Sequence, residues 1–153
     1  MTRIAKKQLS GLLKDSRGST LVEFALLSPA FLLLIFGVIQ VGAYAQNYNA
    51  VRNLASDASR FALVQYQKES RLTPGQLQTQ IMAMGVGDAY NLDPDRLVVM
   101  VTNQTSRIAG VKEMELTVNY APPNFLEFAE VSGLTLTYER PLFLLAGAAP
   151  PAP

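Results

Sequence analysis

A long uncharged run near the N-terminus constrains this chain more than any other feature. Residues 24–51 contain no Lys, Arg, Asp or Glu, and the part that reads FALLSPAFLLLIFGVIQVGAYA (24–45) is almost wholly apolar. About 20 apolar residues suffice to span the hydrocarbon core of a bilayer as a helix, so this segment predicts a transmembrane helix. Glu23 lies directly before the run, and a carboxylate so close to hydrocarbon is costly enough to need a specific reason.

The charges are distributed unevenly around this run. Five of the thirteen Lys and Arg residues lie within residues 1–18 beside a single acid, Asp15, whereas the rest of the chain is slightly acidic. Basic residues flank membrane helices on their cytoplasmic side, which predicts an N-terminus inside and a C-terminus outside. No basic stripe remains beyond residue 18, so we expect no nucleic-acid partner.

The residue types that are missing narrow the possible chemistry. The chain has no Cys and no His, which removes disulfides, the usual zinc ligands and the commonest general base. Glu113 and Glu115 project from one face of a predicted strand, and an exposed polar face accounts for both of them. We therefore expect no enzyme activity, no metal and no cofactor.

Helical periodicity continues beyond the apolar run. Apolar residues recur at helical spacing in the stripe Val51–Phe61, so one helix is predicted over about residues 21–67. Gln40 is the strongly polar side chain deep in the apolar run, and we interpret it as a snorkelling or helix-contact residue near the outer end.

The second half of the chain combines a short helix with strand-like alternation. Thr73 and Gln76 match a capping box, which predicts the helix start. The predicted strands are Arg96–Thr102, Glu113–Tyr120 and Leu134–Glu139. The first is apolar on both faces, as a covered strand would be, and the other two alternate, which indicates one buried and one wet face. The link 122–133 is predicted to include a helical turn capped by Asn124.

These elements predict an α+β fold in which the long N-terminal helix, transmembrane and then amphipathic, packs on a small antiparallel β-sheet. The stripe Val51–Phe61 is the expected cover, because it and the sheet each have one apolar face. The predicted organisation is a basic cytoplasmic leader (1–18), a transmembrane helix (19–45), an extracytoplasmic α+β domain (46–145) and a disordered tail (146–153).

Three interpretations of the N-terminal segment compete. A secretory signal peptide would be cleaved after Ala43-Tyr44-Ala45, but the apolar run is longer than a typical signal-peptide core and Glu23 is misplaced for one. A plain single-pass inner-membrane anchor would keep residues 1–18 and carry a small periplasmic interaction domain. The third interpretation is cleavage on the cytoplasmic side, which leaves the apolar helix as the new N-terminus.

The junction itself favours the third interpretation. Gly18-Ser19-Thr20-Leu21-Val22-Glu23-Phe24 resembles a type IV prepilin processing site, with a glycine before the cut and a glutamate five residues after that glycine. Together with Leu27, Pro29 and the apolar helix, residues 16–45 most resemble the TadE-like pseudopilins of the tight-adherence (Tad/Flp) pilus. Phe24 stands where that family's motif often has tyrosine, so the aromatic ring is kept and the hydroxyl is lost.

The resemblance implies a pilin-like fold and a minor pilin, or pseudopilin, that is required to assemble a pilus used in surface adherence. A prepilin peptidase would cleave between Gly18 and Ser19. Glu23 and Phe24 would serve assembly and register, with Glu23 meeting the new N-terminal amine of a neighbouring subunit. The implied partners are that peptidase, other Tad pilus subunits, the inner-membrane assembly machinery and membrane lipid. The implied location is the bacterial inner membrane with the C-terminal domain in the periplasm, or the pilus itself.

Overall fold

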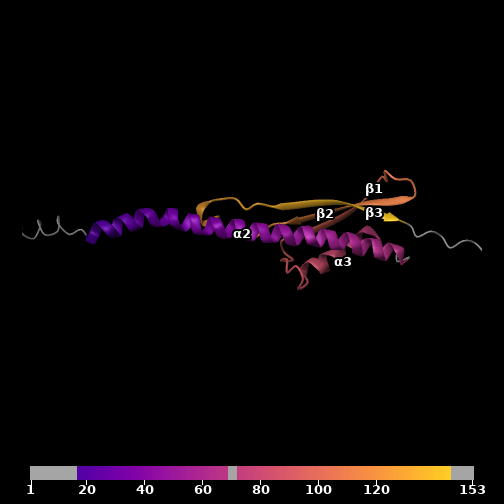
Figure 1. Cartoon of the computed structure of the whole chain (residues 1–153), viewed down its shortest axis with the longest axis horizontal. Helices are drawn as coiled ribbons and strands as arrows, with labels where there is room; N and C mark the ends of the chain where they lie inside the picture. The colour runs from indigo at the N-terminus through magenta and orange to yellow at the C-terminus, as the bar shows by residue number, and fades with distance from the viewer. Residues whose placement is uncertain (1–16, 69–71, 146–153) are drawn as a thin grey trace, which may run out of the picture.

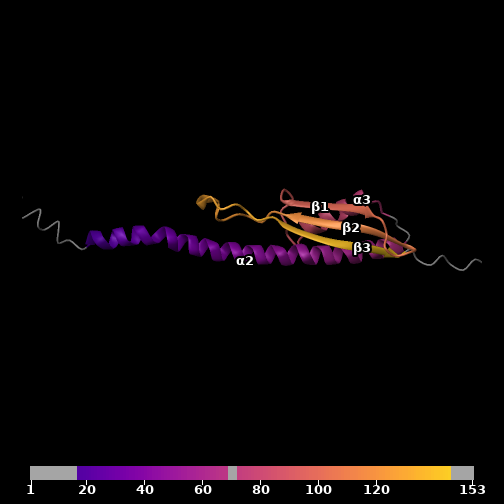
Figure 2. The same cartoon turned by 90° about the horizontal axis from the view of Figure 1, so that it is seen from above.

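The computed structural model describes residues 17–68 and 72–145, and Figures 1 and 2 show it from two sides. Its elements are helices α2 (Arg17–Gln67) and α3 (Pro74–Val86), strands β1 (Leu97–Gln104), β2 (Val111–Tyr120) and β3 (Leu136–Leu145), and the 3-10 helix η1 (Glu127–Ala129). The predicted α+β fold, a long N-terminal helix packed on a small antiparallel sheet, is confirmed. The predicted tail and residues 1–16 of the predicted leader lie outside the described residues.

Helix α2 runs without a break from the apolar run into the folded domain (Figure 1). It begins at Arg17, slightly earlier than predicted. Pro29 lies inside the helix and has no N–H to donate to the carbonyl of Ala25. The Ser28 hydroxyl donates to that carbonyl instead, at 3.3 Å. This local replacement explains how α2 accommodates a proline within its apolar half.

The sheet has the strand order β1-β2-β3, and both pairs are antiparallel. Its inner face is buried under two helices, with α2 mainly over β3 and α3 over β1. The buried residues of α2 are Val51, Leu54, Ala55, Ala58 and Ala62, and Phe61 packs half-buried beside them. The predicted stripe on α2 therefore does cover the sheet.

Helix α3 shares that role, which the sequence did not predict. Thr73 Oγ1 accepts from the Gln76 backbone N–H at 3.3 Å, and the Gln76 side chain accepts from the Thr73 N–H at 2.9 Å, so the predicted capping box is confirmed. Gly85 is buried, and a Cβ there would lie 2.7 Å from Leu97 Cδ2 and 2.9 Å from Leu54 Cδ2. Gly85 thus lets α3 pack closely against both β1 and α2.

The outer face of β1 is open, contrary to the prediction that both of its faces are covered. Val99 and Val101 are buried, whereas Val98 and Met100, which alternate with them along the strand, are 52% and 45% exposed. The reason is that both helices lie on the same side of the sheet (Figure 2). An apolar strand sequence alone cannot show whether the second cover exists.

The β2–β3 loop, residues 121–135, turns back along α2 towards its apolar half (Figures 1 and 2). It contains η1, so the predicted helical turn is present, but Asn124 does not cap it. Asn124 Oδ1 instead accepts from the Leu126 N–H at 3.1 Å, because the turn begins later than the capping pattern suggested. The loop is joined to α2 through Gln40, which corrects our interpretation of Gln40 as a snorkelling or helix-contact residue.

Candidate functional site

The four residues of the predicted processing and assembly site lie in the first two turns of α2. The side chains of Ser19, Glu23 and Phe24 are exposed there, and Gly18 is exposed beside them. Ser19 Oγ donates to Glu23 Oε1 at 3.3 Å, one helical turn away. The helix therefore places the hydroxyl and the carboxylate on one side.

Gly18 has no packing function in the described part of the chain. A Cβ built there meets nothing within 4 Å among these residues. This contrasts with Gly85, where a Cβ would overlap two buried side chains. The packing of the described residues therefore does not require glycine at position 18, and the same holds for Gly37 and Gly42.

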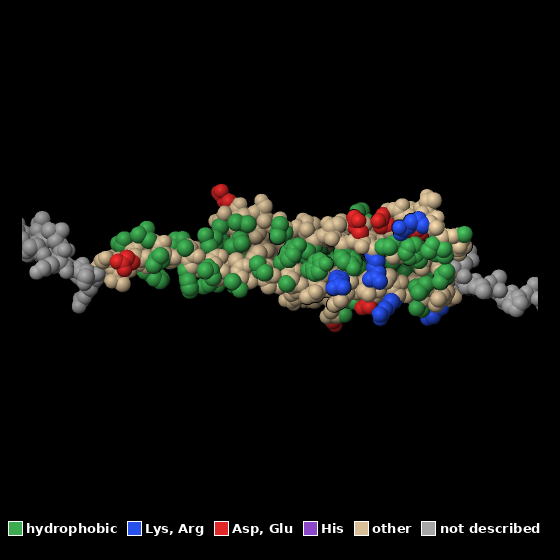
Figure 3. All heavy atoms as spheres, turned by 45° about the horizontal axis from the view of Figure 1, so that its top comes forward, with side chains coloured by type: hydrophobic (Ala, Val, Ile, Leu, Met, Phe, Trp, Pro, Cys, Tyr) green, Lys and Arg blue, Asp and Glu red, His purple; other side chains and the backbone are tan. Residues whose placement is uncertain are grey.

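The apolar half of α2 is a free hydrophobic surface. Its large exposed side chains include Leu21, Val22, Leu26, Leu27, Phe31, Leu34, Val38 and Val41. Figure 3 shows apolar side chains around the N-terminal half of α2, whereas Lys and Arg lie over the folded domain. The helix is long and apolar enough to cross a membrane, and none of its most apolar window is buried. A surface of this size requires an apolar partner.

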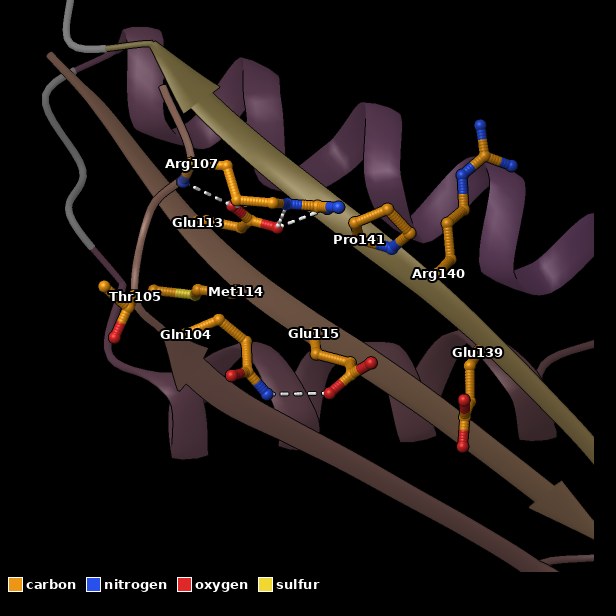
Figure 4. Close-up of a pocket in the computed structure, with 9 residues that line it drawn as sticks. All are labelled: Gln104, Thr105, Arg107, Glu113, Met114, Glu115, Glu139, Arg140 and Pro141. Atoms are coloured by element: carbon orange, nitrogen blue, oxygen red, sulfur yellow. Dashed lines mark hydrogen bonds and ion pairs between the residues drawn. The ribbon is translucent and has the colours of Figure 1, made fainter. Parts of the chain in front are cut away.

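A second polar cluster, which the sequence did not indicate, lies on the outer face of the sheet (Figure 4). Arg107, from the β1–β2 loop, folds over β2, and its Nη2 and Nε donate to Glu113 Oε1 at 2.6 and 3.0 Å. The backbone N–H of Arg107 also donates to Glu113, and the guanidinium lies 5.6 Å from the centroid of the Phe143 ring. Glu113 is only 5% exposed, so the prediction of a simple exposed polar face is wrong for this residue.

The pairing of Arg107 with Glu113 shifts the pKa values of both groups. Hydrogen bonds from Arg107 are the main cause that lowers the pKa of the Glu113 carboxyl, and the same contact raises the pKa of Arg107. A shallow depression of about 530 Å³ adjoins the pair, and Glu115, Glu139 and Arg140 line it with them. Glu115 is held by Gln104, whose Nε2 donates to it at 2.7 Å. The cluster orders the β1–β2 loop and leaves charged groups facing the depression.

A third polar contact ties α2 to the segment that follows α3. The Tyr90 hydroxyl donates to the Asp57 carboxylate. Partial burial first, and then this hydrogen bond, raise the pKa of Tyr90 to about 12. Tyr90 therefore stays protonated and able to donate at every physiological pH.

The fold and these surfaces define the class of protein: an α+β protein with one long apolar N-terminal helix, as in a single-pass membrane protein. Comparison with known families then identifies the helix. The model of the family described as TadE-like protein matches residues 18–60, which confirms the resemblance drawn from the junction. The match includes Gly18, Ser19, Glu23 and Phe24 and ends before the sheet. No curated protein and no solved structure gives a match.

Proposed function

We propose that the protein is a minor pilin, or pseudopilin, that a prepilin peptidase cleaves between Gly18 and Ser19 and that a Tad/Flp pilus needs for its assembly. The observation that carries this proposal is the exposed apolar helix surface that starts beside Gly18 and Glu23, within the segment that matches the TadE-like family. The protein acts through binding and assembly and not as an enzyme.

Glycine at position 18 supports cleavage there. Because a side chain at Gly18 would contact none of the described residues within 4 Å, the fold itself does not require glycine. Cleavage after residue 18 by a peptidase that selects glycine would explain it. Hydrolysis of the Gly18–Ser19 bond on the cytoplasmic side would remove the basic leader and leave a slightly acidic chain.

Cleavage would also create an ammonium group at Ser19. The exposed Glu23 carboxylate is one turn away and open to this amine or to that of a neighbouring subunit. Near hydrocarbon, an ammonium and a carboxylate each lower the desolvation cost of the other. Such a pair sets the register between subunits more than it adds stability, which suits a residue used in assembly.

The exposed apolar half of α2 would serve in two environments. In the inner membrane it would contact lipid tails, and during assembly it would exchange them for helices of other pilus subunits. This exchange costs little, because lipid tails and apolar side chains are similarly apolar. The domain around the sheet would stay on the periplasmic side throughout. Because α2 is continuous, the domain would move together with the helix during assembly.

The open outer face of the sheet supports a second candidate function. The depression beside Arg107 and Glu113 offers charged groups to a periplasmic partner. In that case the chain would be an unprocessed single-pass inner-membrane protein with a small interaction domain. The mature N-terminus distinguishes the two functions: Ser19 in a processed pilin, Met1 or Thr2 in a retained anchor.

The decisive experiment is N-terminal sequencing of the protein from membranes that contain the prepilin peptidase. Wild type should begin at Ser19. Gly18→Leu should keep its leader, whereas the matched control Gly42→Leu should be processed normally, since a Cβ at Gly42 is equally free of contacts. Normal processing of Gly18→Leu would contradict the proposed function.

A further inference from the structure

The β2–β3 loop is positioned beside the apolar run and not beside the sheet that it connects. Its Phe128 ring packs edge-to-face on Phe36 of α2, with ring centroids 5.4 Å apart. Gln40 Nε2 donates to the Pro123 carbonyl at 3.2 Å, and Gln40 Oε1 accepts from the Phe125 N–H at 2.7 Å. These contacts fix the loop at a defined height on the helix.

That height corresponds to the outer leaflet if α2 spans a membrane from Glu23. An α-helix rises 1.5 Å per residue, so Phe36 and Gln40 lie about 20 and 26 Å beyond Glu23. The hydrocarbon core of a bilayer is about 30 Å thick. Gln40 therefore lies close to the outer headgroups, and Phe36 lies within the hydrocarbon of the outer leaflet, about 10 Å below them.

Part of the backbone of the loop is hydrogen-bonded within the loop. Asn124 donates to the Val131 carbonyl at 2.8 Å and accepts from the Leu126 N–H, and further backbone bonds join Leu126 to Ala129 and Val131 and Glu127 to Glu130. Pro122 and Pro123 have no N–H to satisfy. Irregular backbone is costly near hydrocarbon unless its polar groups are paired, and these bonds lower that cost in the loop.

The side chains of the loop also suit an apolar environment. Phe125, Phe128, Val131 and Leu134 are exposed, with Phe128 at 61%. The loop contains no Lys or Arg, and its only charges are Glu127 and Glu130. A water-facing periplasmic loop has no need of four exposed apolar side chains beside an apolar helix.

We propose that the β2–β3 loop is a second membrane contact of this protein, in which Phe128 and its apolar neighbours enter the outer leaflet. The occupant of this surface is lipid, because the surface continues that of the exposed apolar helix on which the loop is held. Without cations, the contact depends on apolar burial and should resist added salt. The inference rests on the proposed membrane span of α2.

The test uses the full chain in vesicles of phosphatidylethanolamine and phosphatidylglycerol. Since the chain has no cysteine, single cysteines can carry a polarity-sensitive fluorophore. Phe128→Cys probes the loop, Leu34→Cys the middle of the apolar run, and Thr102→Cys the exposed sheet face. Spin-labelled lipid acyl chains should quench the labels at Leu34 and Phe128 and leave Thr102 fluorescent at low and high salt.

The other outcomes separate the two proposals. Quenching at Leu34 with Phe128 as bright as Thr102 would overturn the loop contact and leave the membrane span intact. No quenching at either position would overturn both. Equal quenching at Thr102 and Phe128 would mean that the whole domain lies on lipid, which also contradicts a specific loop contact. If the label at Phe128 reports an apolar environment that disappears on dilution to one chain per vesicle, the loop contacts a second copy and the lipid contact is overturned.

Discussion

The two halves of α2 are both rich in apolar residues, but they differ in what covers them. Leu34 in the first half is 65% exposed, whereas Leu54 in the second is completely buried under the sheet and α3. Among the described residues, the β2–β3 loop is the element that reaches back along the first half. An apolar helix face is stable only against an apolar partner. The second half of α2 is therefore a folding surface, whereas the first half is left open to an apolar partner outside the described residues.

The largest expected effect concerns the first half. Glu23→Ala should enter the membrane at wild-type levels or better, because a costly charge is gone. Subunit assembly should fail, since removing one partner of a desolvated ion pair costs about 3–5 kcal/mol. Piliation and co-purification with other pilus subunits measure this, and Glu139→Ala, an exposed acid on β3, is the control. Normal piliation of Glu23→Ala would remove Glu23 from the assembly site.

A pair of leucine truncations tests the comparison directly. Leu54→Ala should lower the free energy of unfolding of the domain by about 2–5 kcal/mol, because it opens a cavity in the core. Leu34→Ala makes the same chemical change on the exposed half and should leave that free energy unchanged. Limited proteolysis of residues 72–145 in detergent checks both variants. Equal protease sensitivity of the two would mean that the halves do not differ as described.

Gln40 joins the two regions, so its replacement should affect only their connection. Gln40→Ala removes both hydrogen bonds to the loop and leaves the Phe125 N–H unpaired, at a cost of about 1–3 kcal/mol. Amide hydrogen exchange at Phe125 should accelerate while exchange in β2 stays slow. The exposed Gln46 provides the control variant, Gln46→Ala. Unchanged exchange at Phe125 would show that the loop is held without Gln40.

The smallest effect belongs to the outer face of the sheet. Arg107 lowers the pKa of Glu113, so the folded state binds a proton there less readily than the unfolded state does. The stabilisation from this pair should therefore be complete above pH of about 4.5 and be lost as the pH falls through the lower folded pKa. The measurement is the free energy of unfolding as a function of pH. The difference between the wild-type and Arg107→Gln curves gives the contribution of the Arg107–Glu113 pair, and Arg140→Gln is the control. A difference that does not vary with pH in the acid range would refute the pairing.

Much of the fold could be predicted because it depends on local patterns. The spacing of Val51, Leu54 and Ala58 predicted which face of α2 is buried, and Thr73 with Gln76 predicted where α3 begins. Alternation in Met114–Tyr120 predicted the inner face of β2 correctly. Each of these signals lies within a few residues, where helical and strand periodicity act.

The parts that were missed depend on contacts between distant residues. Gln40 bonds to Phe125, 85 residues further along the chain, and no pattern around Gln40 encodes that partner. Glu113 looks like any outward-facing strand residue until Arg107 folds over it from the β1–β2 loop. The exposed face of β1 was likewise missed, because Val98 and Met100 are as apolar as the buried residues beside them.

The apolar helix, the charge asymmetry around it, the junction from Gly18 to Phe24 and the inner face of β2 could be read from the sequence alone, because they follow from residue type and spacing along one element. Only the tertiary structure decided where the apolar surface of α2 stops being free, since that depends on how far the sheet and α3 extend along the helix. It also decided that the β2–β3 loop returns to the apolar half. Whether a side chain is buried depends on the surface that packs against it, and such contacts between residues distant in the sequence are set only by the folded structure.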